Sequence, residues 1–292
     1  MQLASMTSMF FTQRGTAEKI PLQDSLHRHK ELGYSALDLN MCAVGRFESE
    51  LNGEDWKERA AALREEADRI GTKIVQSHLP YRTAAHRTAE DIETLNRLSL
   101  RALEISAICG VKWAVIHPLH DPAFPAEAAE EQIRYNTEAY RDLIALAKEK
   151  GVGLAFENCA DSDKVRRFAS TATELAAFVD SLDSPLMGAC WDFGHANLTY
   201  GDTQTWAIRK MGSRIKALHF ADNFGLRDDH VAPFLGKIKW EEIMKVLKEI
   251  GYNGPLVVEV MQNNTMPDAL KNSSMNFLTD ICRYLMKLYE EA

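Results

Sequence analysis

The sequence has no apolar run of about 18 residues, the length that a helix needs to cross a membrane. Its start, MQLASMTSMFFTQRG, lacks the positive charge and long apolar stretch of a secretory signal, so we expect a cytoplasmic protein. The five cysteines are an odd number without CxxC spacing, which favours reduced thiols over a disulfide framework. No GxGxxG or P-loop pattern occurs, so no nucleotide cofactor is expected.

Positive charge is also scarce, since 34 Lys and Arg stand against 42 Asp and Glu, for a net charge of −8. A protein that holds DNA relies on Lys and Arg to displace counterions from the phosphate backbone. The charge therefore argues against a nucleic-acid partner, although it leaves room for a local basic patch. The apolar fraction of 46% and the charged fraction of 26% are ordinary for a globular protein.

Eight apolar segments, each followed by a stretch of helical periodicity, succeed one another along the 292 residues. The predicted strands span residues 4–11, 35–40, 73–79, 112–117, 152–157, 186–192, 215–221 and 255–261. The predicted helices span residues 21–32, 54–70, 89–109, 127–150, 172–182, 203–211, 240–250 and 268–289. Glycines follow five of the helices, where a left-handed cap is favoured. With no linker in sight, this α/β pattern predicts one (β/α)8 TIM barrel domain over residues 1–292.

Side chains that bind metals or protons stand at or near the ends of six predicted strands. They are His78, His117, Glu157, Asp192, His219 and Glu259. Active sites of (β/α)8 barrels lie at the mouth where the C-terminal strand ends meet. Because side chains alternate along a strand, Glu157 shares the inward face with Ala155, and His219 shares it with Ala217. These strand ends therefore predict an active site at that mouth.

Inward carboxylates need a counter-charge, because burial of a bare ion is too costly. No Lys or Arg shares the predicted inward positions, which leaves a metal ion as the natural partner. Glu157, Asp192, His219 and Glu259 offer three oxygens and one nitrogen, a set that suits Mn²⁺, Mg²⁺, Co²⁺ or Zn²⁺. Any one of them alone fits a hydrogen-bonded polar group at a strand end. The four together predict a site for one divalent ion.

The segments ENC, DFGHAN, LHFAD…DDH…LGKIKW and VVEV resemble the xylose-isomerase-like barrel superfamily, over roughly residues 70–262. That superfamily holds tagatose- and psicose-type 3-epimerases, hydroxypyruvate isomerase, inosose-processing enzymes, dehydroshikimate dehydratase and endonuclease IV. The resemblance implies a single metal ion, with Mn²⁺ favoured, on Glu157, Asp192, His219 and Glu259. It also implies that Glu157 and Glu259 are the catalytic pair that transfers protons.

Five further residues are expected to contact the substrate at this mouth. The resemblance implies this role for His78 and His117, and for His195 in the loop after the sixth strand. Asp228 and His230 are placed with them. All five also match metal ligands of endonuclease IV, so a trinuclear zinc phosphoesterase stays open.

The leading hypothesis is a metal-dependent sugar isomerase or epimerase that works through a metal-stabilised enediolate with two glutamate bases. The alternatives are a zinc phosphoesterase, a metal-dependent lyase or dehydratase, and a sugar-binding protein without turnover. The substrate is a sugar, a sugar phosphate or a sugar acid. Basic residues in the predicted loops at the mouth could attract an anion, but the fact that long loops commonly collect charge is the slightly favoured explanation. They are Arg14, Arg46, Arg82, Lys164, Arg166, Arg167 and Arg227.

Apolar residues form more than one stripe along the last predicted helix. They are Phe277, Ile281, Tyr284, Leu285 and Leu288. The sugar epimerases that the chain resembles are often dimers or tetramers, and a second stripe beyond the one that packs on the barrel agrees with that. We therefore expect a homo-oligomer, either a dimer or a tetramer.

Overall fold

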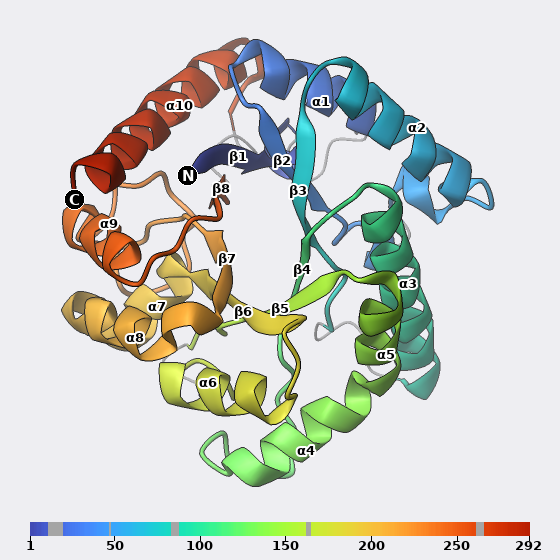
Figure 1. Ribbon diagram of the computed structural model, residues 1–292, viewed down its shortest axis with the longest axis vertical. Coiled ribbons are helices and arrows are strands. Elements are labelled where there is room, and N and C mark those ends of the chain that lie inside the picture. The colour runs from blue at the N-terminus through green and yellow to red at the C-terminus, as the bar shows by residue number, and fades with distance from the viewer. Residues whose placement is uncertain (11–19, 47, 83–87, 162–164, 261–265) are drawn as a thin grey trace.

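A computed structural model shows eight parallel strands arranged as a ring inside a layer of helices (Figure 1). It describes residues 1–292 apart from 11–19, 47, 83–87, 162–164 and 261–265. The strands are β1 Gln2–Met6, β2 Ala36–Asn40, β3 Lys73–His78, β4 Trp113–Ile116, β5 Gly153–Glu157, β6 Met187–Asp192, β7 Ile215–His219 and β8 Pro255–Val258. From β1 to β7 each strand pairs with the next, and β1 also pairs with β8. A bridge between Phe220 and Val258 completes the ring between β7 and β8.

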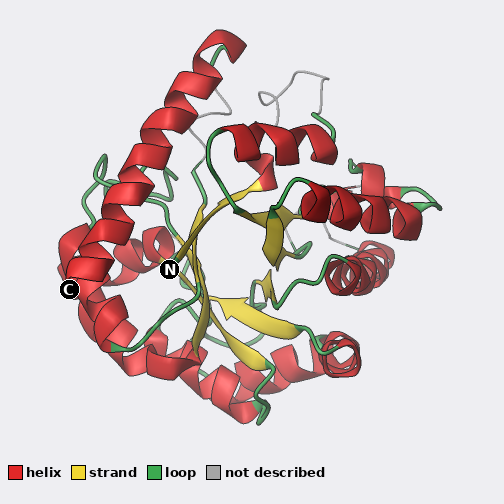
Figure 2. Ribbon diagram, turned by 45° about the horizontal axis from the view of Figure 1, so that its top comes forward, coloured by secondary structure: helices red, strands yellow, loops and turns green. Residues whose placement is uncertain are grey.

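Helices lie outside the strands on every side of the ring (Figure 2). They are α1 Leu22–Glu31, α2 Trp56–Arg69, α3 Ala89–Ile108, α4 Ala129–Ala139, α5 Arg141–Lys150, α6 Ala172–Ser181, α7 Phe193–Tyr200, α8 Gln204–Met211, α9 Trp240–Glu249 and α10 Asp268–Glu291. Within the described ranges, no helix is both long and apolar enough to span a membrane. The predicted (β/α)8 barrel is confirmed.

Local sequence signals explain where several of these helices begin and end. Thr88 and Thr171 cap α3 and α6, and in each case the residue three positions later returns a hydrogen bond to the cap. Gly151 ends α5 with φ of 69°, a left-handed conformation that costs glycine little. Thr88 and Thr171 thus fix where two helices begin, and Gly151 ends α5 two residues before β5 begins.

Small inward-facing residues fill the middle of the barrel. Val115, Ala155, Cys190 and Ala217 form a separate buried cluster within the ring. The outward-facing residues of the same strands, among them Phe156 and Leu218, belong to the larger core between strands and helices. The alternation expected from the sequence is therefore confirmed for β4 to β7, and it directs Glu157 and His219 to the inside of the mouth.

Three predicted element boundaries were wrong. The first strand ends at Met6, because the Thr7 carbonyl accepts from Ser25 Oγ (2.8 Å) and Thr7 Oγ1 accepts from the Asn40 amide (3.0 Å), so the chain turns there. The predicted helix 127–150 breaks between α4 and α5 at Tyr140, whose hydroxyl donates to the His117 carbonyl at 2.7 Å. Helix α7 lies where a loop was expected. The end of the predicted eighth strand, Met261, lies outside the described residues.

The last helix has two apolar faces, as the sequence indicates. Leu285 is buried against the barrel, whereas Phe277 and Tyr284 are about half exposed. The Tyr284 ring also meets Phe234, another exposed aromatic residue, at 5.7 Å between centroids. A dimer or tetramer that uses this face stays a prediction.

One buried histidine lies between α1 and β1, away from the mouth. His29 Nδ1 faces the Ser25 carbonyl at 2.7 Å, its Nε2 lies 3.1 Å from Ser5 Oγ, and Tyr34 packs edge-on against the ring. Burial is the largest cause that lowers the pKa of His29 to about 4 from the ordinary 6.5. The folded protein therefore resists protonation of this ring.

This arrangement predicts an acid-sensitive fold. Between pH 6.5 and 4 the unfolded chain binds a proton at His29 that the folded chain does not, so stability falls as pH falls. The loss contributed by this site by pH 4 is about 3 kcal/mol of unfolding free energy. Denaturant unfolding at several pH values should show a weaker pH dependence for His29→Gln than for the wild type. The control is His27→Gln, at a partly exposed histidine of the same helix that pairs with Glu66. An unchanged slope for His29→Gln would refute the assignment.

Candidate metal and active site

All the residues predicted to act at the mouth come together there. Glu157, Asp192 and His219 are the last residues of β5, β6 and β7, and His78 is the last residue of β3. His117 and Glu259 directly follow β4 and β8. Three sets with ligand atoms within 4.8 Å of one another result. They are His78/Glu157/His219, Glu157/Asp192/His219/Glu259 and His195/Asp228/His230. We call the second of these the inner set and the third the rim set.

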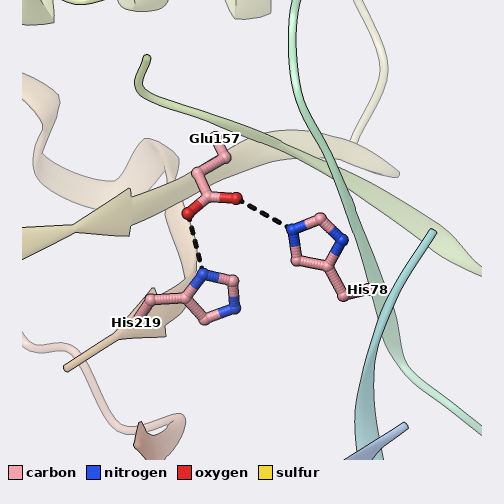
Figure 3. A group of neighbouring side chains, drawn as sticks. All are labelled: His78, Glu157 and His219. Atoms are coloured by element: carbon pink, nitrogen blue, oxygen red, sulfur yellow. Dashed lines mark hydrogen bonds and ion pairs between the residues drawn. The ribbon is translucent and has the colours of Figure 1, made fainter. Parts of the chain in front are cut away.

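Glu157 lies at the centre of the site. Its carboxylate reaches His219 Nδ1 through Oε1 at 2.8 Å and His78 Nε2 through Oε2 at 3.2 Å (Figure 3). His117 Nε2 lies 3.2 Å from the same Oε2 atom. The Glu157 side chain is 1% exposed, so these contacts take place out of water. One carboxylate thus joins three strand ends.

His219 connects Glu157 to the other glutamate. Its Nδ1 atom lies 2.9 Å from Glu259 Oε2, while its Nε2 atom lies 3.1 Å from the Gln76 side-chain amide. Gln76 in turn donates to Asp38 Oδ2 at 2.7 Å. These contacts hold the His219 ring with Nδ1 turned toward both glutamates, as second-layer partners do for metal-binding histidines.

Asp192 is held by its neighbours while one of its oxygens stays unused. Asn158 Oδ1 accepts from the Asp192 amide at 2.7 Å, and Asn158 Nδ2 donates to the Asp192 carbonyl at 3.0 Å. Asp192 Oδ1 accepts from the His195 amide at 2.6 Å and caps α7. Asp192 Oδ2 is buried and has no hydrogen-bond partner among the described residues. A buried carboxylate oxygen without a partner is costly unless a cation binds it.

His195, Asp228 and His230 form the third set at the rim of the mouth. His195 lies on the first turn of α7, not in a loop as predicted, because Asp192 caps a helix directly after β6. Asp228 Oδ2 lies 3.2 Å from His195 Nε2 and 2.8 Å from His230 Nε2. His230 Nδ1 also faces the Glu259 carbonyl at 3.0 Å, which ties this set to β8.

The charged side chains at the mouth shift one another's pKa values. Burial opposes a charge on Glu157, but the neighbouring His219, together with the hydrogen bond from His78, holds the pKa of its carboxyl well below its usual range. Burial likewise opposes protonation of His219, yet its pKa is raised well above the usual value. Since burial raises the pKa of the Cys190 thiol to about 12 and keeps it neutral, we assign this rise to Glu157 and Glu259.

Asp192 differs from the other carboxylates in having no cation against its free oxygen. Burial is the largest cause that raises its pKa to about 6, with the negative charges of Glu157, Asp228 and Glu259 adding to the effect against the attraction of His195. By contrast, His195 and His230 hold the pKa of Asp228 well below its usual range despite its burial. Negative charge at the inner set therefore exceeds what the histidines compensate.

A cavity of about 250 Å³ opens above these residues. Glu157 and Glu259 line it, together with His78, His117 and His195, whereas Asp192 and His219 do not. The walls include Met6, Met9, Asn40, Cys42, Tyr81 and Val260. The two glutamates thus face the space open to a ligand, and Asp192 and His219 lie beneath it.

No Lys or Arg of the described residues lines this cavity. Four of the predicted basic loop residues are engaged elsewhere, since Arg166 pairs with Glu174, Arg227 pairs with Asp229, Arg82 bonds the Tyr135 hydroxyl and Arg167 bonds the Ala160 carbonyl. Arg14 and Lys164 lie outside the described residues. The suggestion that these loops attract an anionic substrate gains no support from the described walls of the cavity.

Sequence reasoning missed three buried polar residues that support the site. Asp38 lies beneath His219, with its Oδ2 atom 3.8 Å from Nε2. Asn158 fixes Asp192, as described above. Asp222 accepts hydrogen bonds from the Phe234 and Ile238 amides and the Trp240 indole, and so folds the loop that carries the rim set. Asp38 lies on the inward face of its strand, and that position was the available signal.

The inner set fits a divalent cation. Three carboxylates and one imidazole nitrogen converge within 4.8 Å, and Asp192 Oδ2 lacks a partner among the described residues. Such an oxygen-rich set suits Mn²⁺, Mg²⁺, Co²⁺ or Zn²⁺. His117, whose pKa burial lowers to about 4, is neutral at pH 7 and is also free to act as a ligand.

The chain is similar in sequence to one uncharacterized protein and to an enzyme of known activity. An uncharacterized protein of Methanocaldococcus jannaschii is 29% identical over 163 residues, which cover 55% of this chain and 54% of the relative. An inosose dehydratase of Clostridium perfringens is 25% identical over 211 residues, which cover 66% of this chain and 68% of the enzyme. The match thus spans about half the length of the first of these relatives.

Solved structures share the fold over the full chain. A D-psicose 3-epimerase crystallised in the presence of D-fructose superposes with a TM-score of 0.75 at 15% identity, covering 98% of this chain and 99% of that one. The IOLI protein with a bound zinc atom gives a TM-score of 0.74 at 17% identity, covering 100% and 99%. Since the sequence profile of the xylose isomerase-like TIM barrel family matches residues 26–281, the protein belongs to that family.

Proposed function

We propose that the protein is a divalent-metal-dependent isomerase or epimerase of a small, uncharged sugar. The observation that carries the proposal is that only two of the four residues of the inner set face the cavity. Glu157 and Glu259 line the cavity and are accessible to a ligand, whereas Asp192 and His219 lie beneath it. The similarity to a D-psicose 3-epimerase in fold, and to an inosose dehydratase in sequence, agrees with chemistry on a sugar-like substrate.

Glu157, Asp192, His219 and Glu259 would hold the ion, with Mn²⁺ favoured by the three oxygen ligands. When bound, such an ion polarises a carbonyl and makes the neighbouring C–H more acidic. Asp38 and Gln76 keep the His219 ring in place, and Asn158 keeps Asp192 in place. The ligand set is thereby pre-arranged before an ion or a substrate arrives.

The two cavity-facing glutamates would move the proton. β6 and β7 separate β5 from β8 in the ring, so Glu157 and Glu259 reach the cavity from different directions. If one carboxylate removes a proton and the other returns one to the opposite face of the same carbon, that carbon is inverted. If a single group carries the proton between adjacent carbons, the product is an isomer.

The walls favour a neutral polyhydroxy substrate over a phosphorylated one. His78, His117 and His195 present ring nitrogens to hydroxyl groups, and no basic side chain of the described walls would neutralise a phosphate. The volume of about 250 Å³ is below the usual range of about 300–1,000 Å³ for drug-sized ligands. A monosaccharide or a related cyclic polyol matches this space.

A metal-dependent phosphoesterase is the second candidate. The observation in its favour is that nine ligand-type residues lie around one mouth, namely His117 and the eight residues of the three sets, which include the rim set His195/Asp228/His230. These residues would be enough to hold more than one ion, and such ions would stabilise the attacking and leaving oxygens of a phosphoryl transfer. The acidic chain and the absence of basic residues in the described cavity walls weigh against a phosphate substrate.

Metal content tests the ligand assignment. Protein purified without chelator should carry close to one equivalent of Mn, Zn, Co or Mg per chain. Asp192→Ala or His219→Ala should bind Mn²⁺ at least about 100-fold more weakly, since even partners behind the ligands are worth about 10- to 100-fold. Asp202→Ala, an exposed carboxylate paired with Lys239, is the control.

Elemental analysis and Mn²⁺ titration measure both quantities. Full metal content in Asp192→Ala and His219→Ala would refute the ligand set. Three equivalents of zinc would favour the phosphoesterase.

Exchange in D₂O tests the proton transfer. With excess Mn²⁺, a panel of ketoses, aldoses, inososes and their phosphates should reveal a substrate whose carbon-bound hydrogen is replaced by deuterium. Glu157→Gln or Glu259→Gln should lower turnover at least about 10²-fold, the typical effect of a lost general base. For an epimerase, each variant should still exchange deuterium into one epimer, because one base remains on one face.

Glu241→Gln, on the exposed side of α9, controls for general effects of the substitution. Normal epimerisation by both site variants with metal bound would show that the two-carboxylate mechanism is wrong. Loss of water in place of deuterium exchange would assign the protein to the dehydratases.

A further inference from the structure

A second cavity, of about 650 Å³, opens at the opposite end of the barrel. Its walls are the first residues of the strands and the ends of the helices before them. They include Arg64, Lys73, Lys112, Trp113, Lys216, Tyr252 and the glycines 110, 212, 251 and 254. This N-terminal face normally serves stability, and layers of branched apolar side chains usually fill the barrel beneath it. Here charged and aromatic side chains line an open space instead.

Lys216 enters this space because of a β-bulge. Ala189 pairs with Ile215 and Cys190 pairs with Ala217, so Lys216 is the extra residue between them. A bulge re-aims a side chain that regular alternation would point to the other face. The Lys216 stem lies over the inward face of Gly188, where an added Cβ would come within 2.3 Å of its Cγ. Glycine at position 188 therefore leaves the room that this lysine occupies.

A glycine also leaves room for the side chain of Trp113 inside the barrel. Its ring faces Gly153 on the next strand, and a Cβ added to Gly153 would come within 2.3 Å of that ring. Tyr252 is a further aromatic residue on the wall, and its hydroxyl donates to the Pro255 carbonyl at 3.0 Å. Two glycines on neighbouring strands thus admit a tryptophan and a lysine to the base of the barrel.

The positive charge of this cavity is largely uncompensated. Arg64, Lys73, Lys112 and Lys216 stand against one carboxylate, Asp68, which Arg64 already engages at 2.7 Å. Over the described ranges, no hydrogen bond or ion pair joins the ammonium groups of the three lysines to any other residue. This concentration occurs in a chain of net charge −8.

Helix C-termini at this face do not account for the lysines. The negative end of a helix attracts cations, and two basic residues serve that purpose here. Arg64 donates to the Cys109 carbonyl at 2.9 Å, and Lys30 donates to the Gly71 carbonyl at 3.1 Å. Lys73, Lys112 and Lys216 make no such bond among the described residues. All three lysines line the cavity.

We infer that this basal cavity is a binding site for a small molecule with two or more phosphate groups. Lys73, Lys112 and Lys216 bind the phosphate oxygens, and Trp113 and Tyr252 form the wall for the rest of the molecule. Nothing on the wall supports turnover, since it has no histidine and no free carboxylate among its described residues. Cys109 is not a nucleophile there, because burial raises the pKa of its thiol to about 12. The site binds and does not convert its ligand.

Inorganic pyrophosphate is the probe, titrated by calorimetry into the metal-loaded protein at low ionic strength. The wild type should bind one equivalent with an affinity that falls as salt rises. Lys112→Met/Lys216→Met, which keeps the stems and removes two charges, should bind at least about 10-fold more weakly, because two charge-assisted bonds to the phosphate oxygens are lost. Lys245→Met, on the exposed face of α9, should bind as the wild type does.

Two further measurements separate this site from the mouth. Pyrophosphate that removes a metal ion from the mouth would do so equally in all three proteins, so only the lysine-dependent part of the binding counts. Binding should also change the tryptophan fluorescence of the wild type and leave that of Trp113→Phe unchanged. Tricarballylate, a tricarboxylate, should bind more weakly than pyrophosphate.

Equal affinity of the wild type and Lys112→Met/Lys216→Met, or no saturable binding at millimolar pyrophosphate, would overturn the inference. Tighter binding of tricarballylate would overturn the choice of phosphate. If the double variant does not fold, the exposed Lys112→Met alone carries the comparison, with the same expected direction.

Discussion

Burial of three carboxylates at one end of the barrel is the constraint on which the site depends. Glu157, Asp192 and Glu259 converge at the mouth, with Glu157 and Asp192 almost wholly removed from water. Bare carboxylates are too costly to bury, so each must meet hydrogen-bond donors or positive charge. Glu157 meets three histidines and Glu259 meets His219, but Asp192 Oδ2 meets nothing among the described residues. We propose that a cation completes this arrangement, and the proposed chemistry depends on it.

The barrel keeps two sites of opposite charge apart, because an apolar layer separates its two ends. Val115, Ala155, Cys190 and Ala217 close the middle of the ring, so ligands reach the interior only from its two ends. At the C-terminal end, carboxylates and histidines favour a cation and a neutral polyol. At the N-terminal end, lysines and Trp113 favour an anion. The same strands thus present opposite charge at their two ends, although the chain as a whole is acidic.

Much of this arrangement was predictable because it depends on local signals. Glycines after helices and apolar runs of strand length predicted eight units in the right order, and the endings of β5 to β8 located Glu157, Asp192, His219 and Glu259. The break at Tyr140 was not predictable, because it depends on a hydrogen bond to His117 that only the folded chain makes. Helix α7 was missed because Asp192 was interpreted only as a ligand and not also as a helix cap.

The direction of the Lys216 side chain is a second feature that could not be predicted from the sequence. Strict alternation along β7 places Ala217 and His219 inside and gives no sign that the preceding lysine also turns inward. Only the register against β6, together with the space at Gly188, shows its direction. Side-chain parity is reliable within a regular strand and fails where one strand holds an extra residue.

A crystal grown with Mn²⁺, with anomalous differences collected to locate the ion, tests the central claim most directly. The account predicts one strong peak bound by Glu157, Asp192 Oδ2, His219 Nδ1 and Glu259, at the base of the cavity. Absence of a peak at this position, with Mn²⁺ bound elsewhere or not at all, would contradict it. The four residues would then be a hydrogen-bonded cluster and not a metal centre.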